Sequence, residues 1–283
     1  MQPPDDDRSG FVLITVVWLA GLLALVAASF AGSVRHQTEA AASALAIARA
    51  EAVILGALRY VSFRLQTTLA AGRRDEAWNG IAMRCTLPSG EALVVTLQDQ
   101  AGLVDLNRAE LPLLHALTAG VGLEREQAAR LAEMIVDYRD RDEITAAGHP
   151  ESQIHSGSGG AGALKNGPFE TIYELDRLPG MQPAILDRLL PWITVHSPQG
   201  EIDPSAAPEA LITALSRAAP MLLSDNQFIA DSPRTRIAIE TAPPSRPRQA
   251  LRAIVLLDEP APRILLVETV RRSAVPAAGG AIC

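Results

Sequence analysis

Cysteine and aromatic residues are scarce in this sequence. Only Cys85 and Cys283 are present, and they form no C-x-x-C pair, so neither a disulfide framework nor a zinc site is indicated. One bridge between the two cysteines is compatible with the sequence, which offers no further support for it. Aromatic residues make up 4% of the chain, and the hydrophobic fraction of 48% owes much to alanine and to the N-terminal segment.

The sequence also has no excess of basic residues. Its 32 acidic and 25 basic side chains give a formal net charge of -7. Because no net positive field attracts the chain toward polyanions, we expect no nucleic-acid partner. The length of 283 residues is sufficient for one large domain or two smaller ones.

The sequence has a long uncharged run near its N-terminus. It extends from Ser9 to Val34 and follows the acidic leader MQPPDDDRSG. A secretory signal would begin with positive charge and carry an apolar stretch of only about 7–15 residues. Residues 11–31 supply the roughly 20 apolar residues that a membrane-spanning helix needs. We therefore expect a leader at residues 1–10 and a transmembrane part at residues 11–31.

The helical pattern continues beyond the apolar run. Residues 33–71 contain no proline and a single glycine, Gly56, so nothing strong interrupts a helix there. Apolar residues recur at helical spacing and predict one face that packs against a domain. These residues are Leu45, Ala48, Ala52, Leu55, Leu58 and Val61.

The N-terminal motif resembles a known processing signal. The letters RSG followed by FVLITVVWLAGLLALVA are similar to the class III signal of type IV pilins and type II secretion pseudopilins. The resemblance implies that a prepilin peptidase cleaves between Gly10 and Phe11 and methylates the new N-terminus. The family usually carries glutamate at the fifth mature position, where this sequence has Thr15, and the K minor subunit is the pseudopilin that typically lacks this acid. On this segment alone, an uncleaved anchor is the alternative.

The rest of the chain alternates between strand and helix patterns. Residues 81–99 predict two strands joined at Pro88–Gly90, and residues 248–259 and 263–272 also predict strands. Periodicity predicts helices over 109–117, 124–139, 168–193 and 208–217. The glycine- and serine-rich stretch 149–167 predicts a loop.

This order predicts an α+β fold, in which the long N-terminal helix packs on a β-sheet domain that an all-helical insertion interrupts. We expect the helix continuation and first strands at residues 32–106, the insertion at 107–190 and the remaining strands at 191–283. The phrases DQAGLVDLN, MIVDYRDRD, NGPFETIYELDRLPGM and GEIDPSAAPEAL are similar to successive signatures of the K pseudopilin, whose pilin-like fold is interrupted in the same way. The last phrase departs from the family, which more often has asparagines there.

The resemblance implies a minor pseudopilin of the type II secretion system rather than an enzyme. Its implied partners are the I and J minor pseudopilins, the major pseudopilin and the prepilin peptidase, at the tip of a short filament that supports export across the outer membrane. The implied location is the bacterial inner membrane, with a single pass and the globular domain in the periplasm. No cofactor is required. A membrane-anchored hydrolase is a distant third reading, because no catalytic arrangement can be argued from residue spacing.

An acidic cluster is the one candidate metal site. It consists of Asp137, Asp140, Asp142 and Glu143 at the end of a predicted helix. Oxygen-rich clusters of this kind can hold Ca²⁺. Since Arg139 and Arg141 are interleaved and the spacing is not that of an EF-hand, an ion-paired, solvated helix end is the alternative.

Three further patterns resemble known sites. LPGMQPAILDRLL has the form of a helix-hairpin-helix around Gly180, so the alternative function is a membrane-anchored DNA-binding protein. Acidic residues outnumber basic ones around it, which favours a structural hairpin. The acidic residues are Glu170, Glu174, Asp176 and Asp187, and the basic ones are Arg177 and Arg188. The glycines before Lys165 lack the spacing of a P-loop, and His149 and His155 lack the spacing of a zinc protease motif.

Overall fold

The structure is a computed structural model of the 283-residue chain. It describes residues 7–72, 78–87, 90, 92–141, 165–224, 226–242, 249–257 and 261–271. The chain divides into two compact units, Met1–Val53 and Ile54–Cys283, which are described separately below.

The first unit is the N-terminal part of helix α1, which as a whole runs from Asp7 to Ala70. The predicted long helix is therefore confirmed. Apolar side chains between Leu13 and Val26 are exposed, and Trp18 is 73% exposed. Contrary to the expectation for residues 11–31, no helix in the described part of the chain combines the length and the apolar character needed to cross a membrane.

The second unit contains a five-stranded antiparallel sheet with the order β1-β2-β5-β6-β7. Its strands are β1 (Asn79–Thr86), β2 (Ala92–Asp99), β5 (Arg236–Ala242), β6 (Gln249–Leu256) and β7 (Arg263–Arg271). Alternate residues of β2, such as Leu93, Val95 and Leu97, are buried, as expected for a strand with one face on a core. The predicted strand pair β1–β2 and the predicted strands β6 and β7 are thus present.

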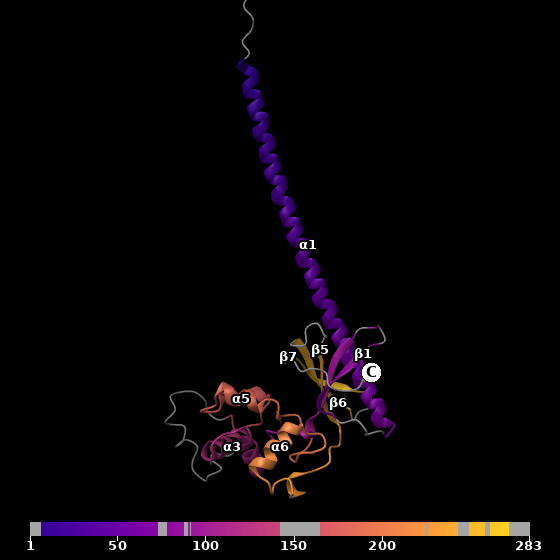
Figure 1. The fold of residues 1–283 in the computed structure, drawn as a ribbon, viewed down its shortest axis with the longest axis vertical. Coiled ribbons are helices and arrows are strands. Elements are labelled where there is room, and N and C mark those ends of the chain that lie inside the picture. Colours follow the sequence, from indigo (N-terminus) through magenta and orange to yellow (C-terminus); the bar gives the residue numbers. More distant parts are fainter. Residues whose placement is uncertain are drawn as a thin grey trace, which may run out of the picture. The chain divides into compact units, whose positions relative to one another are not determined.

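The C-terminal turns of α1 lie beside this sheet (Figure 1). They bury Ile54, Leu58, Val61 and Leu65, which repeat every three to four residues and so share one helix face. The predicted packing face of this helix is partly wrong. Of its six residues, Leu58 and Val61 are buried, whereas Leu45, Ala48, Ala52 and Leu55 are exposed. Leu55 follows the buried Ile54 by one residue and therefore points about 100° away from it.

An insertion separates two neighbouring strands of the sheet. Strands β2 and β5 are hydrogen-bonded neighbours, and Asp99 at the end of β2 lies opposite Ile237 at the start of β5. The chain between them, residues 100–235, thus leaves the sheet at the end of β2 and re-enters it beside that end, at the start of β5. We call this part the helical region; Figure 1 shows its helices grouped together.

The helical region is built from short elements. In chain order they are η1 (Gln100–Gly102), β3 (Val104–Asp105), α2 (Leu111–Gly120), α3 (Arg125–Arg139), η2 (Ile172–Arg177), α5 (Pro183–Leu189), β4 (Ile193–Thr194), α6 (Glu209–Ala218) and η3 (Asn226–Phe228). Strands β3 and β4 pair in parallel. The helices predicted at 109–117, 124–139 and 208–217 are confirmed, whereas 168–193 forms a 3-10 helix and a short α-helix instead of continuous helix.

A single apolar core holds the helical region together. It includes Leu113 and Leu117 of α2, Ile135 of α3 and Leu189 of α5, each completely or almost completely buried. The same core contains Leu211 and Leu215 of α6. The packed region therefore continues past residue 190, where the sequence predicted that the insertion ends.

Cys85 lies on β1 and is completely buried. It is disulfide-bonded. The other cysteine of the sequence, Cys283, lies outside the described residues.

Candidate functional site

Buried polar side chains gather at the junction, which we define as the place where residues 98–102, 203–206 and 232–234 meet. Asp99 is 1% exposed, and its carboxylate accepts hydrogen bonds from the Ala101 amide and the Ser232 hydroxyl. Asp203 accepts from the Ser205 amide at 2.8 Å and from the Ser232 amide at 2.9 Å. Ser232 therefore links the two carboxylates.

The two carboxylates of the junction differ in their acidity. Burial raises the pKa of Asp99, because it outweighs the hydrogen bonds from Ser232 and Ala101. Burial also acts against ionisation of Asp203, but hydrogen bonds from Ser205 and Ser232 hold its pKa below the usual value. Asp203 is thus the carboxylate that the surrounding donors stabilise in its charged form.

The backbones at the junction approach each other very closely. A Cβ atom added at Gly102 would lie 2.2 Å from the carbonyl oxygen of Ala206. The same carbonyl accepts a hydrogen bond of 3.0 Å from Gln98, and the Asp203 amide donates to the Ala101 carbonyl at 2.9 Å. The phrases DQAGLVDLN and GEIDPSAAPEAL, far apart in sequence, therefore meet here, and only glycine fits at position 102.

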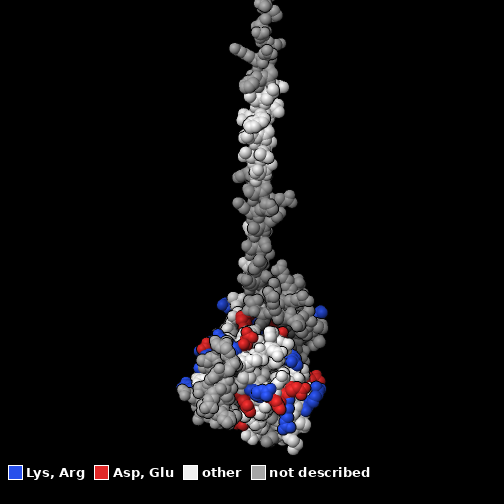
Figure 2. Space-filling view, turned by 90° about the vertical axis from the view of Figure 1, so that its left-hand side faces the viewer, with Lys and Arg blue, Asp and Glu red and all other residues white. Residues whose placement is uncertain are grey.

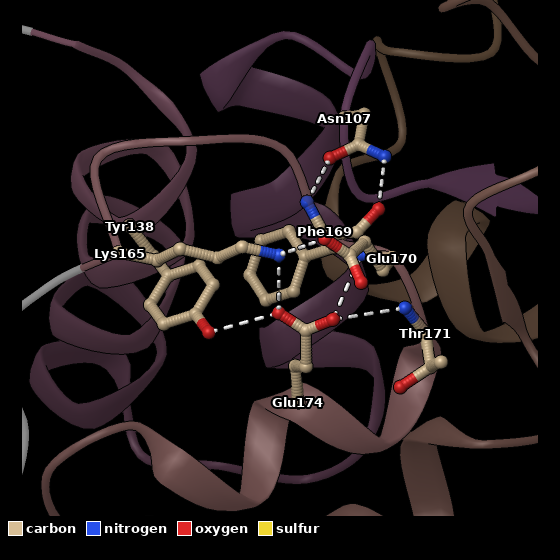
Figure 3. A network of polar contacts seen from close by, with 7 residues as sticks. All are labelled: Asn107, Tyr138, Lys165, Phe169, Glu170, Thr171 and Glu174. Carbon is tan, nitrogen blue, oxygen red and sulfur yellow. Dashed lines mark hydrogen bonds and ion pairs between the residues drawn. The ribbon is translucent and has the colours of Figure 1, made fainter.

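A second polar cluster, the Glu174 network, lies inside the helical region (Figure 3). One oxygen of Glu174 accepts from the amides of Glu170 and Thr171 at 2.8 and 3.1 Å. The other accepts from the Tyr138 hydroxyl at 2.9 Å and from Lys165 Nζ at 3.0 Å. Since Glu174 is 7% exposed, these donors replace water around a buried charge.

The electrostatics of this network favour an ionised Glu174. Burial alone would raise its pKa, but hydrogen bonds from Lys165, the Glu170 amide and Tyr138 together hold the pKa below its usual value. Lys165 is the only lysine of the sequence. Burial and the adjacent Glu174 carboxylate raise the pKa of Tyr138, so its hydroxyl stays a donor.

Asn107 fixes the chain next to this network. Its side-chain amide accepts from the Phe169 amide at 2.7 Å and donates to the Phe169 carbonyl at 2.9 Å (Figure 3). The Phe169 ring stacks on Tyr138 with centroids 4.4 Å apart. One side chain therefore satisfies both backbone groups of a residue in irregular structure.

A third buried carboxylate, Asp105, lies on β3. It accepts hydrogen bonds of 2.8 Å from the amides of Asn107 and Ser197, but burial still raises its pKa to about 6. Nearby, Arg139 donates to the carbonyls of Leu106 and Ala109, each at 2.6 Å. Burial lowers the pKa of Arg139, partly offset by the charge of Asp105.

The buried polar groups of the junction and the Glu174 network are thus engaged in holding backbone segments. In the described ranges no three histidine, cysteine or acidic side chains come together to hold a metal ion. The arrangement holds chain segments that are distant in sequence in fixed positions relative to one another.

The processing residues predicted from sequence lie on α1. Gly10 and Phe11 are helical, with side chains outside those described, and Thr15 is exposed. Of the predicted acidic cluster, Asp137 is buried near the end of α3 and Asp140 is the C-cap. Asp142 and Glu143 lie outside the described residues. A fully solvated helix end is therefore wrong for Asp137.

The predicted hairpin around Gly180 forms a tight turn. Gly180 has φ +78, and Pro183 begins α5. Arg188 donates from Nη1 to the Val121 carbonyl at 2.6 Å, so its guanidinium braces the turn between α2 and α3. On the face shown in Figure 2, acidic and basic side chains are interspersed, which gives no basic track for a phosphate backbone. Residues 149–164 of the glycine- and serine-rich stretch, with His149 and His155, lie outside the described residues.

The sequence prediction missed the Glu174 network, although one signal was available. Thr171 and Glu174 have the T-x-x-E spacing of a capping box, and both reciprocal hydrogen bonds are formed at the start of η2. The junction had no local signal, because its partners are about a hundred residues apart.

Comparison with known proteins gives one family match and structures of similar fold. Residues 92–198 match the family described as type II secretion system (T2SS), protein K. One solved structure with a similar fold is a chain in the crystal structure of the GspK-GspI-GspJ complex from the enterotoxigenic Escherichia coli type 2 secretion system. It is 19% identical, with a TM-score of 0.52, over 84% of this chain and 99% of that chain. No curated protein matches the sequence.

Proposed function

We propose that this chain belongs to the protein K family of the type II secretion system, whose model matches residues 92–198, and that it acts as a minor pseudopilin. In this role it is a structural subunit of a short filament that supports protein export. The observation that carries the proposal is the architecture: a long N-terminal helix, an antiparallel sheet beside its C-terminal turns, and a helical region inserted between the neighbouring strands β2 and β5.

The position that suits this subunit is the filament tip. The helical region of residues 100–235 adds bulk to the sheet, and a helical stack could hardly accommodate that bulk at every step. Thr15 supplies no charge at the position where shaft subunits carry a glutamate that meets a cation of a neighbour. Both features support one copy at the end of the filament.

The partners that fit this position are the I and J minor pseudopilins, because the solved structure of similar fold comes from a GspK-GspI-GspJ complex. Co-purification of the full chain with both proteins tests this. We expect a stable ternary complex, and an epitope tag within residues 156–162 should label filament ends only. Tags at regular intervals along the shaft would contradict the tip position while leaving the family assignment intact.

Processing is a separate part of the proposal. We expect prepilin peptidase to cleave between Gly10 and Phe11 and to methylate Phe11, as the motif SGF before the apolar run suggests. Mass spectrometry of the mature N-terminus decides this. A mature protein that still begins with Met1 would refute processing.

A location in the cell envelope, with the folded region in the periplasm, fits the disulfide. Cys85 is disulfide-bonded, and disulfides persist in oxidising compartments such as the bacterial periplasm. Alkylation of intact cells with and without prior reduction tests this location. Free Cys85 thiol in cells grown under ordinary conditions would contradict it.

Calcium stays a prediction for the acids at the end of α3. Ca²⁺ takes six to eight oxygen ligands, and Asp137 and Asp140 are the two cluster members in the described ranges. We expect millimolar calcium to raise the midpoint of thermal unfolding, and Asp140→Asn to reduce that increase. An unchanged midpoint in the wild type would remove calcium from the proposal.

A further inference from the structure

Strand β7 forms one edge of the sheet. Within the part of the chain that the structure describes, it pairs on one side only, with β6. It is 9 residues long. Its register with β6 shifts between Ile264 and Leu266, and the regular part from Leu266 to Arg271 presents a row of backbone donors and acceptors to any added strand. An edge of this kind is the template for β-strand addition.

Apolar side chains at this edge are exposed on both faces of the sheet. Leu266 is 37% exposed and Val267 is 44% exposed, and successive residues of a strand point to opposite faces. By contrast, the central strand β5 is buried from Ile237 to Ala242. A further strand beside β7 would cover Leu266 on one face and Val267 on the other.

A groove continues from the start of β7 onto α1. It is lined by Arg59, Ser62 and Phe63 of α1 and by residues 261–264. Phe63 is 59% exposed there although it lies next to the sheet. The groove therefore places the exposed Phe63 ring beside the start of β7.

A row of alternating charges crosses the sheet and ends at this edge. Glu240 on β5 lies opposite Arg252 on β6, which lies opposite Glu268 on β7. Arg252 pairs with Glu240 at 2.6 Å and with Glu268 at 3.7 Å. On an added strand, the residue opposite Glu268 would continue this row. A basic residue there would stabilise the cross-strand pair, and an acidic one would destabilise it.

From the free edge, the exposed apolar side chains and the charge row, we propose that β7 binds an extended strand of a partner protein that carries a basic residue between apolar ones. The backbone of that strand would continue the sheet, its apolar residues would cover Leu266, Val267 and Phe63, and its arginine or lysine would pair with Glu268. This surface does not depend on the filament position proposed above.

Two synthetic peptides as long as β7 test the proposal. Each alternates threonine and valine, and they differ only in a central arginine or glutamate. With the full chain in mild detergent, we expect the arginine peptide to bind about threefold to tenfold more tightly. Hydrogen exchange should show new protection within residues 263–271.

Charge reversal provides the decisive variant. Glu268→Arg should reverse the preference between the two peptides, whereas Glu126→Arg, the same change at an exposed site on α3, should leave it unaltered. Val267→Lys, which places a charge on the edge, should weaken both peptides.

Two outcomes would overturn the proposal. One is the absence of binding at millimolar peptide, or a preference that Glu268→Arg does not change. The other is self-association of the full chain that Glu268→Arg abolishes, because the strand at the edge would then come from a second copy.

Discussion

In the sheet, backbone N–H and C=O groups hydrogen-bond to one another along regular strand pairs, and the side chains contribute mainly by packing. Leu97 and Ile239 lie opposite each other on β2 and β5 and are completely buried. In the described part of the helical region the longest helix has 15 residues, and much of the backbone between helices is irregular. There the buried Glu174 and the half-buried Asn107 and Arg139 bond through their side chains directly to backbone amides and carbonyls.

The difference follows from a requirement that both regions share. Each buried backbone N–H and C=O needs a partner, because leaving one unpaired costs about 1–3 kcal/mol. A sheet supplies these partners from its own backbone, whereas irregular chain must obtain them from side chains. Polar residues of the helical region are therefore structural, and their loss should affect that region more than equivalent losses affect the sheet.

The two regions can be followed separately because each has its own tryptophan. Trp78 lies beside the sheet and is 2% exposed, with the Arg234 guanidinium 5.1 Å from its ring centroid. Trp192 directly precedes β4 of the helical region. With the third tryptophan, Trp18, replaced by phenylalanine in all variants, replacing Trp78 or Trp192 in the same way leaves the other as a local reporter.

The largest effect is expected where the two regions meet. In Gly102→Val the new Cβ would lie 2.2 Å from the Ala206 carbonyl oxygen, which belongs to backbone and cannot turn aside. We expect a loss of about 4 kcal/mol or more, or failure to fold, measured by urea unfolding. Gly56→Ala is the control: nothing lies within 4 Å of that position, so the helix should be stabilised by up to about 1 kcal/mol. Equal behaviour of the two variants would contradict the close approach.

A large effect confined to one region is expected for Glu174→Ala. The change leaves the Glu170 and Thr171 amides and the Tyr138 hydroxyl without their acceptor, at a cost of about 3 kcal/mol. The Trp192 transition should move to lower urea, and the Trp78 transition should move less. Glu170→Ala removes an exposed partner of Lys165 and should have a small effect. A shift of the same size in both tryptophans would show that the regions unfold as one.

The disulfide should matter to the sheet, since Cys85 lies on β1. Cys85→Ser is expected to lower the free energy of unfolding by about 2–4 kcal/mol, seen first at Trp78. Dithiothreitol should lower the free energy of unfolding of the wild type by a similar amount. It should leave the free energy of unfolding of Cys85→Ser unchanged. If the reductant had no effect on the wild type, the bond would not contribute to stability.

Local pattern predicted much of this fold. The helices α2, α3 and α6 and the strands β1, β2, β6 and β7 follow from periodicity and turn residues, because each signal lies within a dozen residues. Strand β5 was not singled out, although RIAIETA is rich in isoleucine, because buried strands show no polar alternation. Its burial from Ile237 to Ala242 explains the missing pattern.

The junction could not be predicted from the sequence in the same way. Position 102 requires glycine because the Ala206 carbonyl lies against it. Asp99 accepts a hydrogen bond from Ser232, which lies 133 residues later in the chain. Such contacts depend on the chain returning to the strand it left, which no local window contains. The capping box at Thr171 and Glu174 is different, since its four-residue spacing is visible in the sequence.

The smallest predicted effect concerns pH and the buried carboxyl of Asp105. Its pKa of about 6 in the folded state exceeds the value of about 3.9 of an unfolded aspartate. The folded state therefore binds the proton more tightly, and stability from this group is present at low pH and lost as pH rises through about 6. The free energy of unfolding of the wild type, minus that of Asp105→Asn, should be about 1 kcal/mol larger at pH 5 than at pH 7.5. The neighbouring Leu106→Val removes no titratable group, so its difference from the wild type should be equal at both pH values. A difference for Asp105→Asn that stays flat or falls toward pH 5 would mean that water or Arg139 keeps this carboxylate charged in the folded protein.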